Sequence, residues 1–166
     1  MRERQAERRR RGAREFEAFV AGAGGRLLHT ATLLTGEAPA HNARARRLLT
    51  AALARTYAHW DPERGEDPYD RTRQELVARF AATAWRHHLH REPGGELGVL
   101  ARLTPQERLI LVLRLYEGVA EEQVAALVGL PAERVRVICT RAIATLRSTP
   151  GGSRRPRPRP SAEGVL

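Results

Sequence analysis

The residues with the clearest capacity for chemistry are arginines on one predicted helix near the C-terminal end of the chain. All 29 basic residues are Arg, and a guanidinium keeps its charge and can donate paired hydrogen bonds to a phosphate or a guanine edge. Apolar side chains recur at helical spacing over residues 132–147, so the charged side chains between them are expected to point outward. The candidate DNA-binding set of this helix is Arg134, Arg136, Val137, Thr140 and Arg141, with Arg134 best placed for a base edge.

The elements that position these side chains form a predicted helix-turn-helix. A helix is expected to begin at Thr104, a capping residue followed by a proline and an acidic first turn. Two further helices, over residues 121–128 and 132–147, flank a turn at Gly129. A small residue at the helix contact, Ala125, and a glycine four positions later permit two short helices to cross at a steep angle.

Composition excludes several classes of function. The 166 residues are 42% hydrophobic and 5% aromatic with a formal net charge of +10, which predicts a helical protein packed by Leu, Val and Ala, with nucleic acid as its first partner. The single Cys139 permits no internal disulfide, as in a reducing cytoplasm. No apolar run approaches the roughly 18 residues of a membrane span. We find no phosphate loop, catalytic triad or metal-ligand spacing, so we expect no enzyme activity, no catalytic residue, no cofactor, no metal and no small-molecule substrate.

The chain divides by composition, and the predicted fold class is all-α. Seven Arg and two Glu lie within residues 1–14, and alternating Pro and Arg near the C-terminus predicts an extended segment. Helical periodicity predicts three helices before Pro93, over Phe16–Leu34, up to Trp60, and from Tyr69 to about Leu89. The predicted organisation is a basic N-terminal arm at 1–14, a three-helix bundle at 15–92, a linker at 93–102, a helix-turn-helix domain of three to four helices at 103–147 and a disordered Arg/Pro tail at 148–166.

An ordered set of motifs runs through the C-terminal residues. It consists of Leu103-Thr104-Pro105-Gln106-Glu107-Arg108, the run Leu111–Gly118, the run Val124–Pro131, Arg134-Val135-Arg136, Arg141-Ala142 and Leu146-Arg147. Together these motifs resemble the DNA-binding region four of extracytoplasmic-function (ECF) sigma factors, the promoter-recognition subunits of bacterial RNA polymerase. The resemblance implies that the protein binds duplex promoter DNA, associates with the RNA polymerase core, is regulated by an anti-sigma factor and works in the cytoplasm.

The N-terminal half resembles region two of the same family more loosely, through Phe16-Glu17-Ala18-Phe19-Val20, Leu33–Glu37 and Ala51–Trp60. In that family an acidic residue, two apolar residues and an amide contact the polymerase clamp. This chain has Arg47, Leu48, Leu49 and Thr50 there, and reversing a charge at a buried contact costs several kcal/mol. The departure motivates an alternative: a degenerate sigma fold that binds an anti-sigma factor or another regulator without engaging polymerase.

The end of the third predicted helix carries Arg79 and Arg86 beside Trp85. Basic residues beside an aromatic can follow a single DNA strand, so Arg79 and Arg86 join the candidate DNA-binding residues. Packing of Trp85 in the core is the alternative, because its spacing from Leu76 and Phe80 places it on the apolar face.

Overall fold

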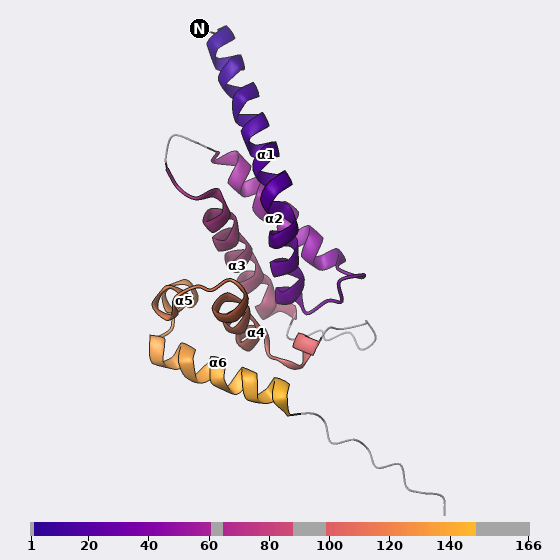
Figure 1. Ribbon diagram of the computed structural model, residues 1–166, viewed down its shortest axis with the longest axis vertical. Helices are drawn as coiled ribbons and strands as arrows, with labels where there is room; N and C mark the ends of the chain where they lie inside the picture. The colour runs from indigo at the N-terminus through magenta and orange to yellow at the C-terminus, as the bar shows by residue number, and fades with distance from the viewer. Residues whose placement is uncertain (1, 61–64, 88–98, 149–166) are drawn as a thin grey trace, which may run out of the picture.

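The first half of the chain folds into three packed helices. The computed structural model describes residues 2–60, 65–87 and 99–148. In it, α1 (Arg2–Thr35), α2 (Ala43–Ala58) and α3 (Pro68–His87) lie against one another (Figure 1). Their shared core contains Leu27, Ala31, Leu49, Ala52 and Leu76, which recur every three or four residues along each helix. The predicted three-helix bundle and the all-α class are confirmed.

Helix α1 is longer than its apolar pattern predicted. Periodicity placed its start at Phe16, but the helix begins at Arg2 and continues through Gly22, Gly24 and Gly25 without a break. A glycine costs a helix up to about 1 kcal/mol, and the buried side chains of Leu27, Ala31 and Leu34 in the following turns offset this cost. Residues 2–14, expected as a separate arm, are therefore the first turns of α1.

The second half begins with the short 3₁₀ helix η2 (Val99–Arg102), which lies inside the predicted linker at 93–102. Helix α4 (Pro105–Leu111) starts with a full capping box, because the Thr104 hydroxyl accepts from the Glu107 backbone N–H and the Glu107 carboxylate accepts from the Thr104 backbone N–H. A π-helical turn, η3 (Val112–Tyr116), continues α4. Then follow α5 (Glu121–Val128) and α6 (Ala132–Arg147), whose bounds agree with the predicted helices.

The two halves share one hydrophobic core. Leu34 of α1 and Val77 and Phe80 of α3 are buried in the same cluster as Ile110, Leu113, Val124, Val135 and Ile138 of the second half. Sequence composition predicted two domains joined by a linker, and the described residues on either side of it pack together. Residues 93–98 of that linker and 149–166 of the predicted tail lie outside the described residues. The domain boundaries therefore stay a prediction.

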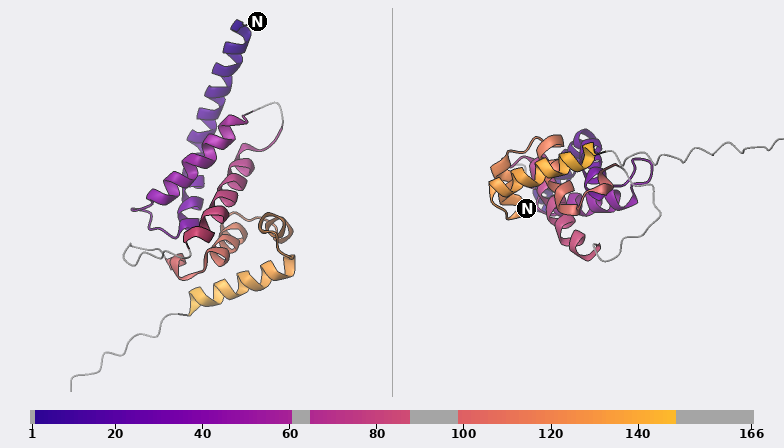
Figure 2. Two further views of the ribbon diagram at one scale, coloured as in Figure 1. Left: turned by 180° about the vertical axis from the view of Figure 1, so that it is seen from behind. Right: turned by 90° about the horizontal axis from the view of Figure 1, so that it is seen from below.

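Helix α6 is the outermost element of the folded body at one end, and the start of α1 projects from the other end (Figures 1 and 2). None of the helices in the described ranges is long and apolar enough to cross a lipid bilayer. The arrangement leaves one long side of α6 facing away from the rest of the body.

Candidate nucleic-acid interface

The turn between α5 and α6 has the geometry that its residues predicted. Gly129 ends α5 in the left-handed region, with φ of 67° and ψ of 35°, a conformation that costs other residues about 1–2 kcal/mol. Its N–H and the N–H of Leu130 both donate to the carbonyl oxygen of Ala125. Pro131, which has no N–H to lose, precedes α6. The chain therefore turns within three residues, and α6 leaves at a fixed angle to α5.

The two faces of α6 differ sharply. Val135, Ile138 and Ala142 are at most 2% exposed and pack into the body, with Cys139 half-buried beside them. Arg134, Val137 and Arg141, at spacings of three and four residues, are exposed and lie on one side of the helix. Val137 is 50% exposed, an unusual position for an apolar side chain on a charged face. We call Arg134, Val137 and Arg141 the α6 outer row.

The side chain of Arg134 makes no hydrogen bond or ion pair with any residue of the described ranges, so its guanidinium has all its donors available. Arg141 is also exposed, but its Nε donates to Glu107 Oε1 at 2.8 Å. Burial alone would raise the pKa of the Glu107 carboxyl; hydrogen bonds from Thr104 and Arg141 outweigh that effect and lower the pKa. This contact fixes α6 to the start of α4, while the Nη groups of Arg141 stay outside it.

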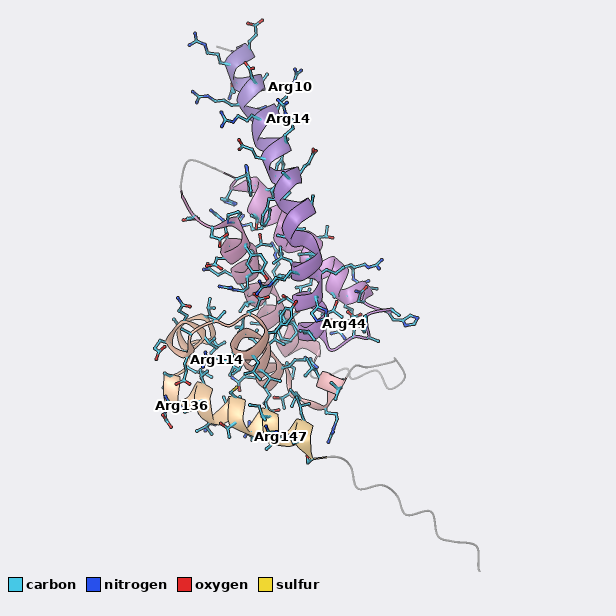
Figure 3. All side chains as sticks on the ribbon, in the orientation of Figure 1. Arg10, Arg14, Arg44, Arg114, Arg136 and Arg147 are labelled. Carbon is cyan, nitrogen blue, oxygen red and sulfur yellow. The ribbon has the colours of Figure 1, made fainter. Side chains whose placement is uncertain are left out.

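Arg136 is engaged more completely than the sequence suggested. Its Nη2 donates to Glu121 Oε1 at 2.8 Å, its Nε to Glu121 Oε2 at 3.4 Å and its Nη1 to Glu133 Oε2 at 3.0 Å. All three guanidinium nitrogens therefore have carboxylate partners, and the pair with Glu121 joins α6 to α5 (Figure 3 labels Arg136). Thr140 is exposed, and its hydroxyl donates to the Arg136 carbonyl oxygen, which leaves its methyl group on the surface.

The candidates in the first half lie far from the α6 outer row along the chain. Arg79 is partly exposed and sits 3.8 Å from Glu75, and its Nε is buried without a hydrogen-bond partner. Arg86 lies in the last turn of α3, and the side chains of Arg86 and Trp85 are outside the described part of the chain, as are His88 and His90. Within the described ranges Arg79 has an ion pair with Glu75 and none with a residue of α6.

The four predicted polymerase-contact residues divide between core and surface. Leu49 is buried in the core of the bundle, and Leu48 is partly buried against both core clusters. Arg47 and Thr50 are exposed, and the Thr50 hydroxyl donates to the Arg46 carbonyl oxygen. Only Arg47 and Thr50 of this set present their side chains fully at the surface of α2.

Sequence reasoning missed a buried carboxylate that joins the two halves. Glu117, which follows η3, has a side chain with 0% exposure. It accepts from the Thr30 hydroxyl of α1 and, at 2.9 and 3.0 Å, from the Tyr69 hydroxyl of α3. Arg26 and Arg73 lie 3.7 and 3.6 Å from the same carboxylate. We call these five residues the Glu117 cluster.

The Glu117 cluster changes the acidity of Tyr69. Burial of the phenol and its hydrogen bond to the Glu117 carboxylate raise the pKa of Tyr69 to about 12. Glu117 directly precedes Gly118, which has a φ of 69°. No spacing signal links it to residues 30 and 69, so only the tertiary structure reveals the cluster.

Two other expectations concern thiol and metal chemistry. Cys139 packs against two core clusters, and burial raises the pKa of its thiol, which disfavours the reactive thiolate. Within the described ranges, no group of three or more His, Cys, Asp or Glu side chains could hold a metal ion.

Comparison with known proteins finds similarity to sigma factors of RNA polymerase. Residues 99–148 match the family described as sigma-70, region 4. The "RNA polymerase sigma-E factor" of Streptomyces coelicolor is 29% identical over 153 residues, covering 80% of this chain and 84% of that protein. The protein of the same name from Streptomyces avermitilis is also 29% identical over 153 residues, with 80% and 83% covered.

The fold also matches a solved structure, that of the sigma factor RpoE in complex with the anti-sigma factor NepR from Bartonella quintana. The TM-score is 0.54 at 15% identity, and the match covers 80% of this chain and 94% of that chain. The relatives named RNA polymerase sigma-E factors match over 80% of this chain, and they do not favour the alternative of an interaction module without polymerase engagement.

Proposed function

We propose that this chain is an extracytoplasmic-function sigma factor of bacterial RNA polymerase and that it selects a promoter element through the α6 outer row. Its general role is in transcription initiation. The observation that carries the finer proposal is the exposed Arg134 on the helix that follows the turn at Gly129. We assign binding, rather than catalysis, as the role of this surface.

The chemistry of the α6 outer row fits a major groove. The unpaired guanidinium of Arg134, in the first turn of α6, can donate two hydrogen bonds to O6 and N7 of a guanine. Val137, one turn later, offers an apolar contact for the methyl group of a thymine. Arg141 is held by Glu107 through its Nε alone, so its outer nitrogens can contact a phosphate while α4 fixes its direction.

Arg136 and Thr140 take supporting roles in this proposal. The three carboxylate contacts of Arg136 support a positioning role, which sets the angle between α5 and α6. The exposed methyl of Thr140 borders the outer row. Arg79 and Arg86 remain our proposed contacts to a separated strand near the end of α3.

We propose the RNA polymerase core, duplex promoter DNA and an anti-sigma factor as the partners, which places the protein in the cytoplasm. The relatives named sigma-E factors support the first two, and the solved structure bound to an anti-sigma factor supports the third kind. The exposed Arg47 and Thr50 on α2, supported beneath by Leu48 and Leu49, are our proposed polymerase contacts.

The test of promoter recognition begins with selection of binding sites from a random duplex pool by the purified full chain. Arg134→Ala is expected to weaken binding to the selected site by about 5- to 150-fold, the range for one lost bidentate base contact, and to relax the preference at one position. Arg147→Ala is the matched control, because Arg147 is also exposed on α6 but lies in its last turn. Equal losses for Arg134→Ala on selected and random duplexes contradict base reading.

Polymerase engagement is tested by transcription in vitro with purified core enzyme and the selected site. Specific transcripts are expected from the wild-type chain. Arg47→Glu restores the acidic residue that the family has at this position, and it is expected to raise affinity for the core. Arg44→Glu, on the same exposed side of the α2 start, controls for charge alone. An equal gain for both variants, or no transcript from wild type, contradicts the assignment of Arg47.

A further inference from the structure

The first turns of α1 form an exposed rod that no described function uses. Residues 3–11 are exposed, and the rod extends past the ends of α2 and α3 (Figures 1 and 2). Near Gly12 the rod meets the body, since a side chain there would lie 3.6 Å from Trp60. We call residues 2–11 the α1 rod.

A cluster of aromatic side chains fixes the direction of the α1 rod. The ring of Phe16 lies 4.8 Å from Tyr57 and 5.0 Å from Trp60, and Phe19 lies 5.7 Å from Trp60. Aromatic contacts at these distances add about 0.5–1.5 kcal/mol beyond area burial. The rod therefore leaves the body from an anchored base at the end of α2, and its direction is set by packing.

The charge on and beside the α1 rod is unfavourable for an isolated helix. Arg4 and Arg8, and also Arg10 and Arg14, stand four residues apart, and each such pair of like charges costs about 0.2–0.5 kcal/mol. Positive charge in the first turns also opposes the helix dipole. Arg11 is paired, at 2.8 Å from Glu15, whereas Arg4, Arg8 and Arg10 have no carboxylate partner in the described ranges. A concentrated negative charge on a partner would relieve all of these costs.

We propose that the α1 rod is a second, sequence-independent DNA contact that binds duplex phosphates at the end of the molecule opposite α6. Its chemistry fits this partner and excludes a lipid surface, because a membrane-surface helix needs an apolar face and residues 2–11 contain Ala6 as their only apolar side chain. Arg4 and Arg8, four residues apart on one face, are separated by a rise of about 6 Å, which is close to the spacing of every second phosphate along one strand. Figure 3 shows Arg10 and Arg14 pointing away from the body.

The contact is independent of base reading by the α6 outer row, because the two surfaces lie at opposite ends of the chain's longest dimension. It extends the proposed function without relying on it. A duplex long enough to reach both ends is expected to bind more tightly than one that covers α6 alone, and the gain is expected to vanish at high salt.

The test measures the affinity of the full chain for a random-sequence duplex over a series of salt concentrations. Arg4→Gln/Arg8→Gln keeps helix propensity and removes two charges from one face of the α1 rod, because residues four apart share a face. Two lost phosphate contacts reduce the slope of log affinity against log salt by about 1.8. From 50 to 200 mM salt, the wild-type chain is then expected to lose about 12-fold more affinity than this variant.

The matched control is Arg44→Gln/Arg46→Gln, which removes the same charge from exposed positions at the start of α2. This pair is expected to leave the slope nearly unchanged. Equal slopes for the two double variants overturn the proposal, because net charge alone then explains the binding. An unchanged slope for Arg4→Gln/Arg8→Gln also overturns it. Arg134→Ala is expected to keep the wild-type slope of log affinity against log salt on the same random duplex. The salt slope therefore tests the α1 rod, and the selected site tests base reading by α6.

Discussion

Replacing Glu117 with alanine is expected to lower the free energy of unfolding by about 3–5 kcal/mol, the cost of breaking a buried ion pair by removing one partner. The carboxylate is fully enclosed, and two hydroxyls donate to it from α1 and α3. In the variant the hydroxyl of Tyr69 loses its carboxylate acceptor. Arg73, whose side chain is 13% exposed, loses one of two carboxylate partners and keeps Asp70 at 2.9 Å.

The loss is large enough to measure by heat or urea. For a chain of this size, 1 kcal/mol corresponds to about 2–4 °C in Tm, so Glu117→Ala is expected to melt about 6–20 °C below wild type. Glu66→Ala is the control, because Glu66 forms an exposed pair with Arg71 at 2.8 Å, and exposed pairs contribute about 0–1 kcal/mol.

A double-mutant cycle assigns the effect to the Glu117 cluster. Tyr69→Phe alone is expected to cost about 1.5–3 kcal/mol, as for hydrogen bonds to a charged group. Glu117→Ala already removes the acceptor of the Tyr69 hydroxyl. The double variant Glu117→Ala/Tyr69→Phe is therefore expected to lose less free energy of unfolding than the sum of the two single-variant losses, by about 0.5–3 kcal/mol. Additive losses, or a loss for Glu117→Ala no greater than that for Glu66→Ala, would refute the reasoning.

Three further outcomes follow from the structure. Gly36→Ala is expected to lower the free energy of unfolding by about 1–2 kcal/mol through backbone strain alone, because Gly36 has a φ of 70°. The added Cβ would also lie 2.6 Å from a guanidinium nitrogen of Arg108 in α4. Urea unfolding measures the loss. Arg136→Gln and Glu121→Gln are expected to weaken selected-site binding equally, by about fivefold at most, with no further loss in the double variant. Because the pKa of Tyr69 is raised from 10.0 to about 12 in the folded state, protonated Tyr69 stabilises the fold fully below pH 10, and this contribution disappears as pH rises through about 12. Titration of the Tyr69 phenol by ultraviolet absorbance measures this pKa, and Glu117→Gln is expected to lower it.

Matched variants decide each of these outcomes. Gly25→Ala is expected to stabilise the chain by up to about 1 kcal/mol, because Gly25 is helical with open space around it; a similar loss at Gly25 and Gly36 contradicts the strain argument. Glu122→Gln changes the same charge as Glu121→Gln at an exposed neighbour. If Arg136→Gln weakens binding and Glu121→Gln does not, Arg136 reads DNA directly. A pKa of Tyr69 at the ordinary tyrosine value contradicts its burial against a carboxylate.

Local sequence signals predicted the elements that depend on local physics. The bounds of α6 follow from its apolar periodicity and from Gly129 and Pro131, and the start of α4 follows from the capping residue Thr104. The start of α1 could not be predicted in this way, since residues 2–15 contain no apolar period and the helix there continues from a packed segment.

The candidate site was predictable in part, because side-chain direction on a helix is local and pairing partners are not. The outward placement of Arg134, Val137 and Arg141 follows from the 3.6-residue period. The engagement of Arg136 depends on Glu121, fifteen residues away on another helix, and the Glu117 cluster depends on residues up to 87 positions apart. Such contacts become visible only when the helices are placed in space.

The core that spans both halves of the chain limits how its parts can be exchanged with those of relatives. A chimera that carries residues 99–148 from another protein would set foreign side chains against Leu34, Val77 and Phe80. The grafted segment would also need its own carboxylate opposite Thr30 and Tyr69. Promoter specificity is therefore transplanted more safely by changing the three surface positions of α6 than by swapping the whole C-terminal module.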